Sequence, residues 1–213
     1  IKIIYIFIML NKIVIATHNK DKLVELKKGL SGLNIDLYDL SFFPKIGEII
    51  EDGETLRENA YIKAKTVFDH TGLPSIADDT GLEVDYLNGA PGVYTARYAG
   101  ENCTYEDNVN KLFNVMKNVP IKDRGAQFKT SMVFLDKKKE LYSDGIVKGI
   151  ISEKIKGLAG FGYDPLFYIP NEGKTFAEMS IEKKNIISHR GLAIKGLIAK
   201  IDAYFKTLKK ENA

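Results

Sequence analysis

The hydrophobic positions of this chain recur at two periods, and each period predicts a different element. Residues 12–17 (KIVIAT) form an apolar run typical of a buried strand, and residues 21–30 (DKLVELKKGL) place leucines three and four positions apart, as on one face of a helix. A short strand is expected near 35–38, a helix over 55–69, and another buried strand at 73–78 (LPSIAD). The first half therefore predicts strands that alternate with helices.

The second half of the chain adds a strictly alternating pattern. Residues 124–152 contain two stretches of alternating apolar and polar positions, separated by three lysines, which predicts two antiparallel strands. Thr104 followed by Asp107 has the spacing of a capping box before a helix with one apolar stripe, and a last helix over about 190–209 also has one apolar face. We therefore expect an α/β fold with a mixed, twisted β-sheet and flanking helices.

The domain organisation follows from length and from the N-terminal segment. The 213 residues can bury a sizeable core and contain neither an internal repeat nor a separating linker, so we expect one domain over 12–213, preceded at 1–11 by an extension and the start of the first strand. The N-terminal run IKIIYIFIML is shorter than the roughly 20 apolar residues of a membrane span and lacks a signal-peptide cleavage site. Our hypothesis is that Met9 is the natural start and that residues 1–8 are an upstream extension.

Charge and cysteine content indicate the class of partner. The net charge is +3 and the lysines are spread along the chain, so the composition favours neither nucleic acid nor a membrane, whereas a small polyanionic substrate would suit it. The single cysteine, Cys103, rules out an internal disulfide framework and is consistent with a reducing cytoplasm. We expect a cytoplasmic protein.

The first stretch with candidate chemistry is the loop THNKDK at 17–22, between the first strand and the first helix. The Thr17 hydroxyl, the Asn19 amide, Lys22 and the exposed amides of the helix N-terminus could converge on a phosphate group. Asn-Lys-Asp before a helix is equally typical of ordinary capping, and no Walker pattern is present. The residues alone leave both interpretations open.

The second is the pair Asp78-Asp79 at the end of the predicted buried strand. Two adjacent carboxylates repel each other unless a cation or a shared proton compensates, and Mg²⁺ prefers such oxygen ligands together with substrate phosphates. A water held there could be the nucleophile, with a neighbouring Asp as its base. An isolated pair would more often be a helix cap or turn next to Thr80-Gly81. Further carboxylates nearby could add ligands or could equally form the solvated face and the cap of the second helix; they are Glu51, Asp52, Glu54 and Glu58.

The third is GFGYDP at 160–165, where two glycines bracket Phe161. The ring can present its face to a planar base, and Asp164 or the loop amides can recognise the base edge. A turn with a core phenylalanine is the alternative.

The fourth is KKNIISHR at 183–190, just before the last helix. Arg190 offers a planar fork and Lys184 a point charge for phosphate or base oxygens. His189 alone would more often be a structural histidine than a catalyst.

Together these stretches resemble the inosine triphosphate pyrophosphatase family. The matching pieces occur in the family's order and cover essentially the whole chain from Lys12 onward. They are IATHNKDKLVEL (15–26), ENAYIKA (58–64), ADDTGLEVDYLNGAPGVYTARYAG (77–100), GFGYDPLF (160–167) and FAEMSIEKKNIISHRG (176–191).

The resemblance implies a mixed α/β fold of two lobes with a central active-site cleft, usually in a homodimer, and Mg²⁺-dependent hydrolysis of deaminated purine nucleoside triphosphates to the monophosphate and pyrophosphate. It also implies residue roles. Glu51 and Asp79 would be the metal carboxylates, with Asp79 also the proton acceptor and Asp78 its catalytic partner. The implied triphosphate residues are Thr17, His18, Asn19, Lys22, Lys63 and Thr80. The implied nucleotide and base pocket comprises Phe161, Gly162, Tyr163, Asp164, Lys184, His189 and Arg190.

Base specificity has a physical argument. Hypoxanthine and xanthine carry an oxygen at C6 where adenine carries an amine, so donors such as Arg190, His189 or Lys184 would favour the keto bases. Guanine shares that oxygen, so its rejection must arise near its 2-amino group.

The chain departs from the family pattern at two positions. His18 stands where the family usually has Gly or Ser, and its ring could crowd the loop or add a titratable contact to the phosphates, whereas Thr80 stands where Ser is usual and keeps the hydroxyl. Two alternative functions stay open: a pyrophosphatase for a broader set of modified nucleotides, and a nucleotide-binding regulator without catalysis. A nucleic-acid-binding module is the least favoured, because the chain has no basic stripe.

Overall fold

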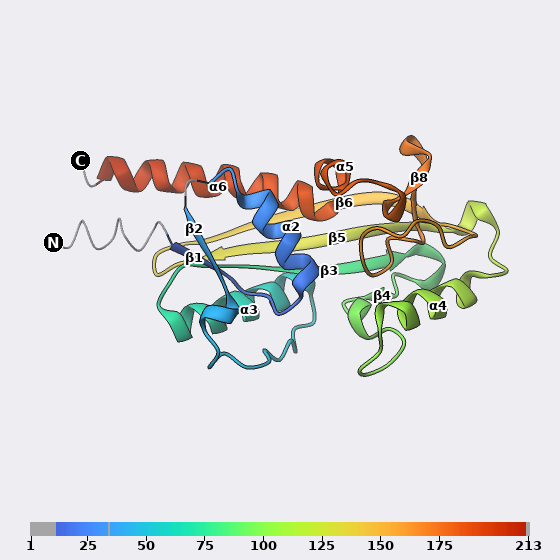
Figure 1. The fold of residues 1–213 in the computed structure, drawn as a ribbon, viewed down its shortest axis with the longest axis horizontal. Coiled ribbons are helices and arrows are strands. Elements are labelled where there is room, and N and C mark those ends of the chain that lie inside the picture. Colours follow the sequence, from blue (N-terminus) through green and yellow to red (C-terminus); the bar gives the residue numbers. More distant parts are fainter. Residues whose placement is uncertain (1–11, 34, 212–213) are drawn as a thin grey trace. The chain divides into compact units, whose positions relative to one another are not determined.

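The computed structural model describes residues 12–33 and 35–211, and the predicted extension and start at Met9 lie outside them. Within the described residues, eight strands form one mixed sheet in the order β2-β1-β3-β5-β6-β7-β8, with β4 paired to β3 (Figure 1). The predicted α/β fold with a mixed sheet is confirmed. The strands are β1 (Lys12–Ile15), β2 (Asp36–Asp39), β3 (Ser75–Val84), β4 (Pro91–Gly92), β5 (Gly125–Leu135), β6 (Glu140–Ile151), β7 (Phe167–Ile169) and β8 (Lys174–Thr175).

The predicted helices are present close to their expected boundaries. The helices are α2 (Lys20–Leu30), α3 (Leu56–Thr71), α4 (Tyr105–Met116), α5 (Ile181–Ile187) and α6 (His189–Glu211). Short 3₁₀ turns occur at Leu40–Phe42, Asp85–Leu87, Thr95–Arg97, Ile121–Asp123, Pro170–Glu172 and Phe176–Glu178.

Local capping explains where two of these helices begin. Thr104 and Asp107 form the predicted capping box at the start of α4, and Thr55 and Glu58 form another at the start of α3. Gly72 ends α3 in the left-handed conformation, which glycine adopts without strain. Glu58 is therefore a capping residue, as one interpretation of the nearby acids expected.

The chain divides into two compact units. Unit 1 contains the described residues up to Asp79, Ser131–Asp144 and the chain from Leu192 onward, and unit 2 contains Thr80–Thr130 and Gly145–Gly191. Strand β3 contributes to both units, and the division falls between Asp79 and Thr80.

Unit 1 has a hydrophobic cluster on each face of its strands. Side chains alternate along β1, so that Ile13 and Ile15 pack with α2 and α6, whereas Val14 packs with α3. Figure 1 shows α2 and α6 on one side of these strands and α3 on the other. Strand β1 pairs in parallel with both β2 and β3, as strand–helix–strand connections require.

Unit 2 has one core, which α4 and a group of aromatic rings build. Phe128, Phe167 and Phe176 lie with ring centroids 4.6 to 6.3 Å apart. The buried guanidinium of Arg124 donates to four backbone carbonyls, among them Met116 at 2.5 Å near the end of α4 and Ile151 at 2.6 Å at the end of β6. This arginine joins the two elements although burial lowers its pKa.

One boundary expected from the sequence is wrong. Asp78 and Asp79 lie inside β3, which continues to Val84, and therefore do not mark a strand end or a turn. The strand continues because Leu82 and Val84 return to the core and because Leu82 pairs with Gly92 of β4. Residues 183–187, which precede the last helix, also form part of a separate helix, α5.

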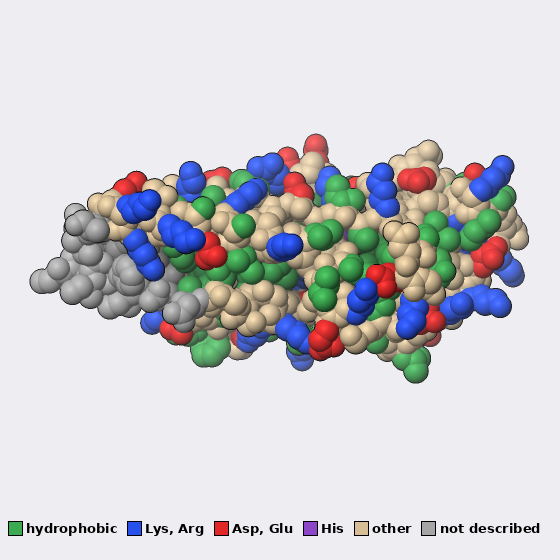
Figure 2. All heavy atoms as spheres, turned by 90° about the horizontal axis from the view of Figure 1, so that it is seen from above, with side chains coloured by type: hydrophobic (Ala, Val, Ile, Leu, Met, Phe, Trp, Pro, Cys, Tyr) green, Lys and Arg blue, Asp and Glu red, His purple; other side chains and the backbone are tan. Residues whose placement is uncertain are grey.

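Two further features of the described residues are the hydropathy of the helices and the surface charge. None of the helices within residues 12–33 and 35–211 combines the length and the apolar character that a membrane span requires. Figure 2 shows lysine and arginine side chains interspersed with acidic ones on the face that it displays.

Candidate active site

Polar groups of the loop after β1 cap the N-terminus of α2. Asn19 is the N-cap, and its Oδ1 accepts from the backbone N–H groups of Asp21 and Lys22 at 3.0 Å each. The Thr17 hydroxyl accepts from the Asn19 N–H at 3.2 Å, and the exposed His18 donates from Nε2 to the Gly47 carbonyl at 3.0 Å. The capping interpretation is thus confirmed for Asn19, and phosphate binding by this loop stays a prediction.

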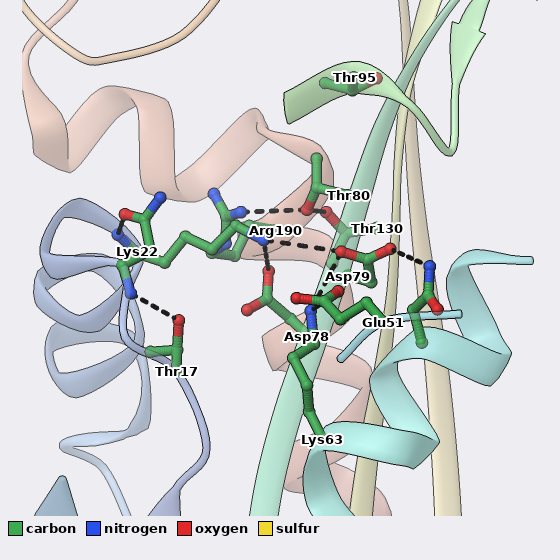
Figure 3. A network of polar contacts seen from close by, with 12 residues as sticks. Thr17, Lys22, Glu51, Lys63, Asp78, Asp79, Thr80, Thr95, Thr130 and Arg190 are labelled. Carbon is green, nitrogen blue, oxygen red and sulfur yellow. Dashed lines mark hydrogen bonds and ion pairs between the residues drawn. The ribbon is translucent and has the colours of Figure 1, made fainter. Parts of the chain in front are cut away.

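In unit 1, three carboxylates and two lysines lie close together, and we call this group the carboxylate cluster (Figure 3). Lys22 Nζ lies 3.6 Å from Asp78 Oδ2 and 3.9 Å from Asp79 Oδ1. Lys63 Nζ lies 2.6 Å from Glu51 Oε2 and 3.1 Å from Asp79 Oδ1. Residues from α2, α3, β3 and the segment before α3 therefore converge, although they lie far apart in the sequence.

Lys63 is the central cation of the carboxylate cluster. Its side chain is buried, whereas that of Glu51 is about one-third exposed, at 34%. Burial lowers the pKa of the Lys63 ammonium, but the negative charges of Asp79, Glu51 and Asp78 outweigh this effect, so its pKa lies above the ordinary value. Lys63 is therefore charged at neutral pH.

Asn59 also contacts the carboxylate cluster, and the sequence analysis did not identify it. Its Nδ2 donates to Asp79 Oδ2 at 3.4 Å and its Oδ1 accepts from the Gly53 N–H at 2.8 Å, which ties Asp79 to the segment before α3. A signal was available, because Asn59 and Lys63 are four residues apart and share the buried face of α3 with apolar residues such as Ala60.

The predicted metal carboxylates fit a magnesium ion in their chemistry. Glu51 and Asp79 both direct an oxygen at one cation, the Lys63 ammonium. Among the described residues, no group of three or more His, Cys, Asp and Glu side chains is arranged to hold a metal ion. Mg²⁺ needs only one or two protein carboxylates when waters and substrate phosphates complete its shell, so the donor set is sufficient.

In unit 2, Asp164 organises the predicted base-binding loop, residues 160–165, which we call the Phe161 loop. Its Oδ2 accepts from Lys184 Nζ at 2.6 Å and from the Phe161 N–H at 3.0 Å. Gly160 and Gly162 have φ of 75° and 59°, and a Cβ on Gly160 would lie 2.0 Å from Asp164 Oδ2. The sequence analysis suggested that Asp164 could recognise a base edge. In the structure, Asp164 Oδ2 accepts hydrogen bonds from Lys184 and from the Phe161 loop.

Two cations lie near the half-buried ring of Phe161. Lys184 Nζ is 4.8 Å and Arg190 Cζ is 5.6 Å from the ring centroid. Arg190 Nη2 also donates to the Thr80 hydroxyl at 3.0 Å (Figure 3). The hydroxyls of Thr80 and Thr130 are hydrogen-bonded at 2.7 Å. The sequence analysis did not identify Thr130. Arg190 is buried, so these contacts fix the direction of its guanidinium.

His189 and Tyr163 occupy core positions of unit 2. The His189 ring stacks on Phe128, with centroids 4.5 Å apart and an interplanar angle of 19°, so the structural interpretation of this histidine is supported. Tyr163 is buried and donates its hydroxyl to the Thr95 carbonyl at 2.9 Å, and burial raises the pKa of that hydroxyl. A direct contact of either residue with a nucleotide stays a prediction.

The chain is similar to a protein family model, to known proteins and to solved structures. The family model described as "Ham1 family" matches residues 13–200. A protein named dITP/XTP pyrophosphatase from Listeria innocua is 48% identical over 88% of this chain and 93% of its own length, and one from Thermoanaerobacter sp. is 46% identical over 86% and 92%. The structure of a HAM1 protein from Coxiella burnetii has a TM-score of 0.82 and 37% identity, covering 90% of this chain and 98% of its own. The Staphylococcus aureus Ham1 protein has a TM-score of 0.81 and 39% identity, covering 91% and 99%.

Proposed function

This chain belongs to the Ham1 family, and from that premise we propose that it hydrolyses deaminated purine nucleoside triphosphates such as dITP, ITP and XTP to the monophosphate and pyrophosphate. The reaction class is hydrolysis of an acid anhydride, in agreement with the names of relatives that are more than 40% identical. The observation that carries the proposal is the convergence of Lys22, Lys63, Glu51, Asp78 and Asp79 in the carboxylate cluster.

We assign the triphosphate chemistry to unit 1. Lys22 and Lys63 supply ammonium groups for phosphate oxygens, and Asp79 accepts the proton of the attacking water, with Asp78 beside it as a second negative charge. Glu51 and Asp79 would hold a Mg²⁺ ion, which when bound stabilises the negative charge of the phosphate oxygens. Asn59 keeps Asp79 oriented through its amide.

We assign base recognition to unit 2. Phe161 offers a ring face for stacking, which is favourable for any base, so the ring alone provides affinity without selectivity. Selectivity then comes from donors toward the C6 oxygen, and Arg190 and Lys184 supply donors near the ring. Adenine presents an amine there and leaves these donors poorly matched.

The experiment that tests the function measures pyrophosphate release from dITP, XTP, GTP, ATP and a pyrimidine triphosphate, each with Mg²⁺ and with EDTA. We expect rapid release from dITP and XTP, slow release from GTP and ATP, and loss of activity in EDTA. Equal turnover of the pyrimidine triphosphate would instead support the broader pyrophosphatase. Binding of dITP without any hydrolysis would support the regulator.

The oligomeric state and the cellular location of the protein stay predictions. We propose a homodimer, which size-exclusion chromatography with light scattering tests, since the chain mass is 23.9 kDa. We also propose a cytoplasmic location, where the nucleotide pool is found, which fractionation of cells that express the protein from its own locus would test.

A further inference from the structure

The carboxylate cluster holds more negative than positive charge. Glu51, Asp78 and Asp79 contribute three negative charges, and Lys22 and Lys63 contribute two positive charges, so these five side chains have a formal charge of minus one. Lys63 contacts two of the carboxylates and is buried, whereas Lys22 approaches from α2 at longer distances. The ammonium of Lys63 is thus the principal internal compensation for Glu51 and Asp79.

Lys63 contacts the same two carboxylates that would hold a metal ion. Lys63 Nζ contacts Glu51 Oε2 at 2.6 Å and Asp79 Oδ1 at 3.1 Å, and the carboxylates of these two residues are the ones proposed for Mg²⁺. Mg²⁺ binds oxygen at about 2.0–2.1 Å. An ammonium and a divalent cation held by the same two carboxylates repel each other strongly in a partly buried site, so we expect binding of the metal to displace the ammonium.

We propose that Lys63 is a positioning residue that serves as an internal counter-ion: its ammonium holds Glu51 and Asp79 together in the metal-free protein, and the side chain turns so that the ammonium pairs with the triphosphate when metal and nucleotide bind. This inference rests on the proposed function. A triphosphate provides new negative oxygens for the displaced ammonium, so each ligand favours the other. Metal and nucleotide therefore bind cooperatively, and the coupling is reciprocal.

Titration calorimetry of Mg²⁺ into the nucleotide-free protein tests the proposal with a readout independent of catalysis. Lys63→Met should bind Mg²⁺ more tightly than the unmodified protein, by about 5- to 150-fold, the usual range for coupling between two sites. Lys65→Met is the matched control, because Lys65 lies on the same helix but is exposed and pairs with Asp69. Its Mg²⁺ affinity should equal that of the unmodified protein. Equal or weaker affinity in Lys63→Met would overturn the proposal.

A second measurement keeps the proposal testable if Lys63→Met does not fold. In the unmodified protein, Mg²⁺ should raise the affinity for the non-hydrolysable analogue α,β-imido-dITP by at least about 5-fold, and Lys63→Gln, which keeps a hydrogen-bond donor, should reduce this coupling. An affinity for the analogue that does not depend on Mg²⁺ would overturn the inference. Failure of the proposed function is a different result, namely no pyrophosphate release from dITP by the unmodified protein.

Discussion

The carboxylate cluster and the Phe161 loop both contain a buried lysine paired with an aspartate, yet the two pairs differ in charge balance. Lys184 and Asp164 are both buried, lie 2.6 Å apart, and the same carboxylate oxygen also accepts the Phe161 N–H. Lys63 instead contacts both Asp79 and the partly exposed Glu51. The first pair stabilises a loop, whereas the second group has an excess of negative charge that another cation can compensate.

The largest effect is expected for Asp79→Asn, which keeps the shape of the side chain but removes its charge. Turnover should fall by about 10²- to 10⁴-fold, because base catalysis typically contributes that much. Steady-state pyrophosphate release from dITP measures the loss, and circular dichroism controls for folding. Near-native turnover would show that Asp79 is not the base.

The next effect concerns stability in the Phe161 loop. Asp164→Asn should lower the free energy of unfolding by about 3–5 kcal/mol, because it leaves the buried Lys184 ammonium without its charged partner. Asp69→Asn is the matched control, since its pair with Lys65 is exposed to solvent and its loss should lower the free energy of unfolding far less. Urea unfolding compares the two, and equal losses would contradict the contrast drawn between buried and exposed pairs.

Magnesium should distinguish the two buried lysines. The Mg²⁺ concentration is set about 100-fold above the dissociation constant of Lys63→Met for Mg²⁺. At that concentration the free energy of unfolding of this variant should rise by about 2.7 kcal/mol, because its carboxylates bind the metal in the folded state. Lys184→Met should gain no more stability than the unmodified protein does. Thermal unfolding with and without Mg²⁺ measures this, and an equal extra gain in both variants would remove the proposed difference.

Phe161→Ala should mainly affect substrate affinity. Loss of base stacking is worth about 1–3 kcal/mol, so KM for dITP should rise by about 5- to 150-fold with a smaller change in kcat. Initial rates over a range of dITP concentrations measure both constants. An unchanged KM would show that the ring serves the core alone.

The smallest effect is expected for His18→Gly, which removes the hydrogen bond to the Gly47 carbonyl. This exposed bond should contribute about 1 kcal/mol or less to stability, and activity should persist. The pH profile of turnover is the informative measurement, because a ring near the phosphates would alter it. An unchanged profile would exclude a titrating contact between His18 and the substrate.

Much of the fold could be predicted from local pattern. The helical period of α2, α3 and α6, the capping box of Thr104 and Asp107, and the alternation in β5 and β6 depend on neighbours within a few residues, so they are readable in the sequence. Motif resemblance also identified Lys22, Lys63 and the adjacent aspartates. It did not identify Asn59, because this residue lies in an ordinary helical pattern, or Thr130, because this residue lies in a strand of alternating pattern.

By itself the sequence determined the types of the longer elements, the mixed α/β class and the set of charged residues available for chemistry, since each depends on short-range periodicity or on residue identity. Only the tertiary structure decided that β3 continues through Asp78 and Asp79, because Leu82 and Val84 are buried in a core with residues that are distant in the sequence, such as Phe176. Tertiary contacts likewise brought Lys63 between Glu51 and Asp79 and assigned Asp164 to Lys184. The energy of a charge depends on which opposite charges surround it after burial, and the chain order alone does not specify those neighbours.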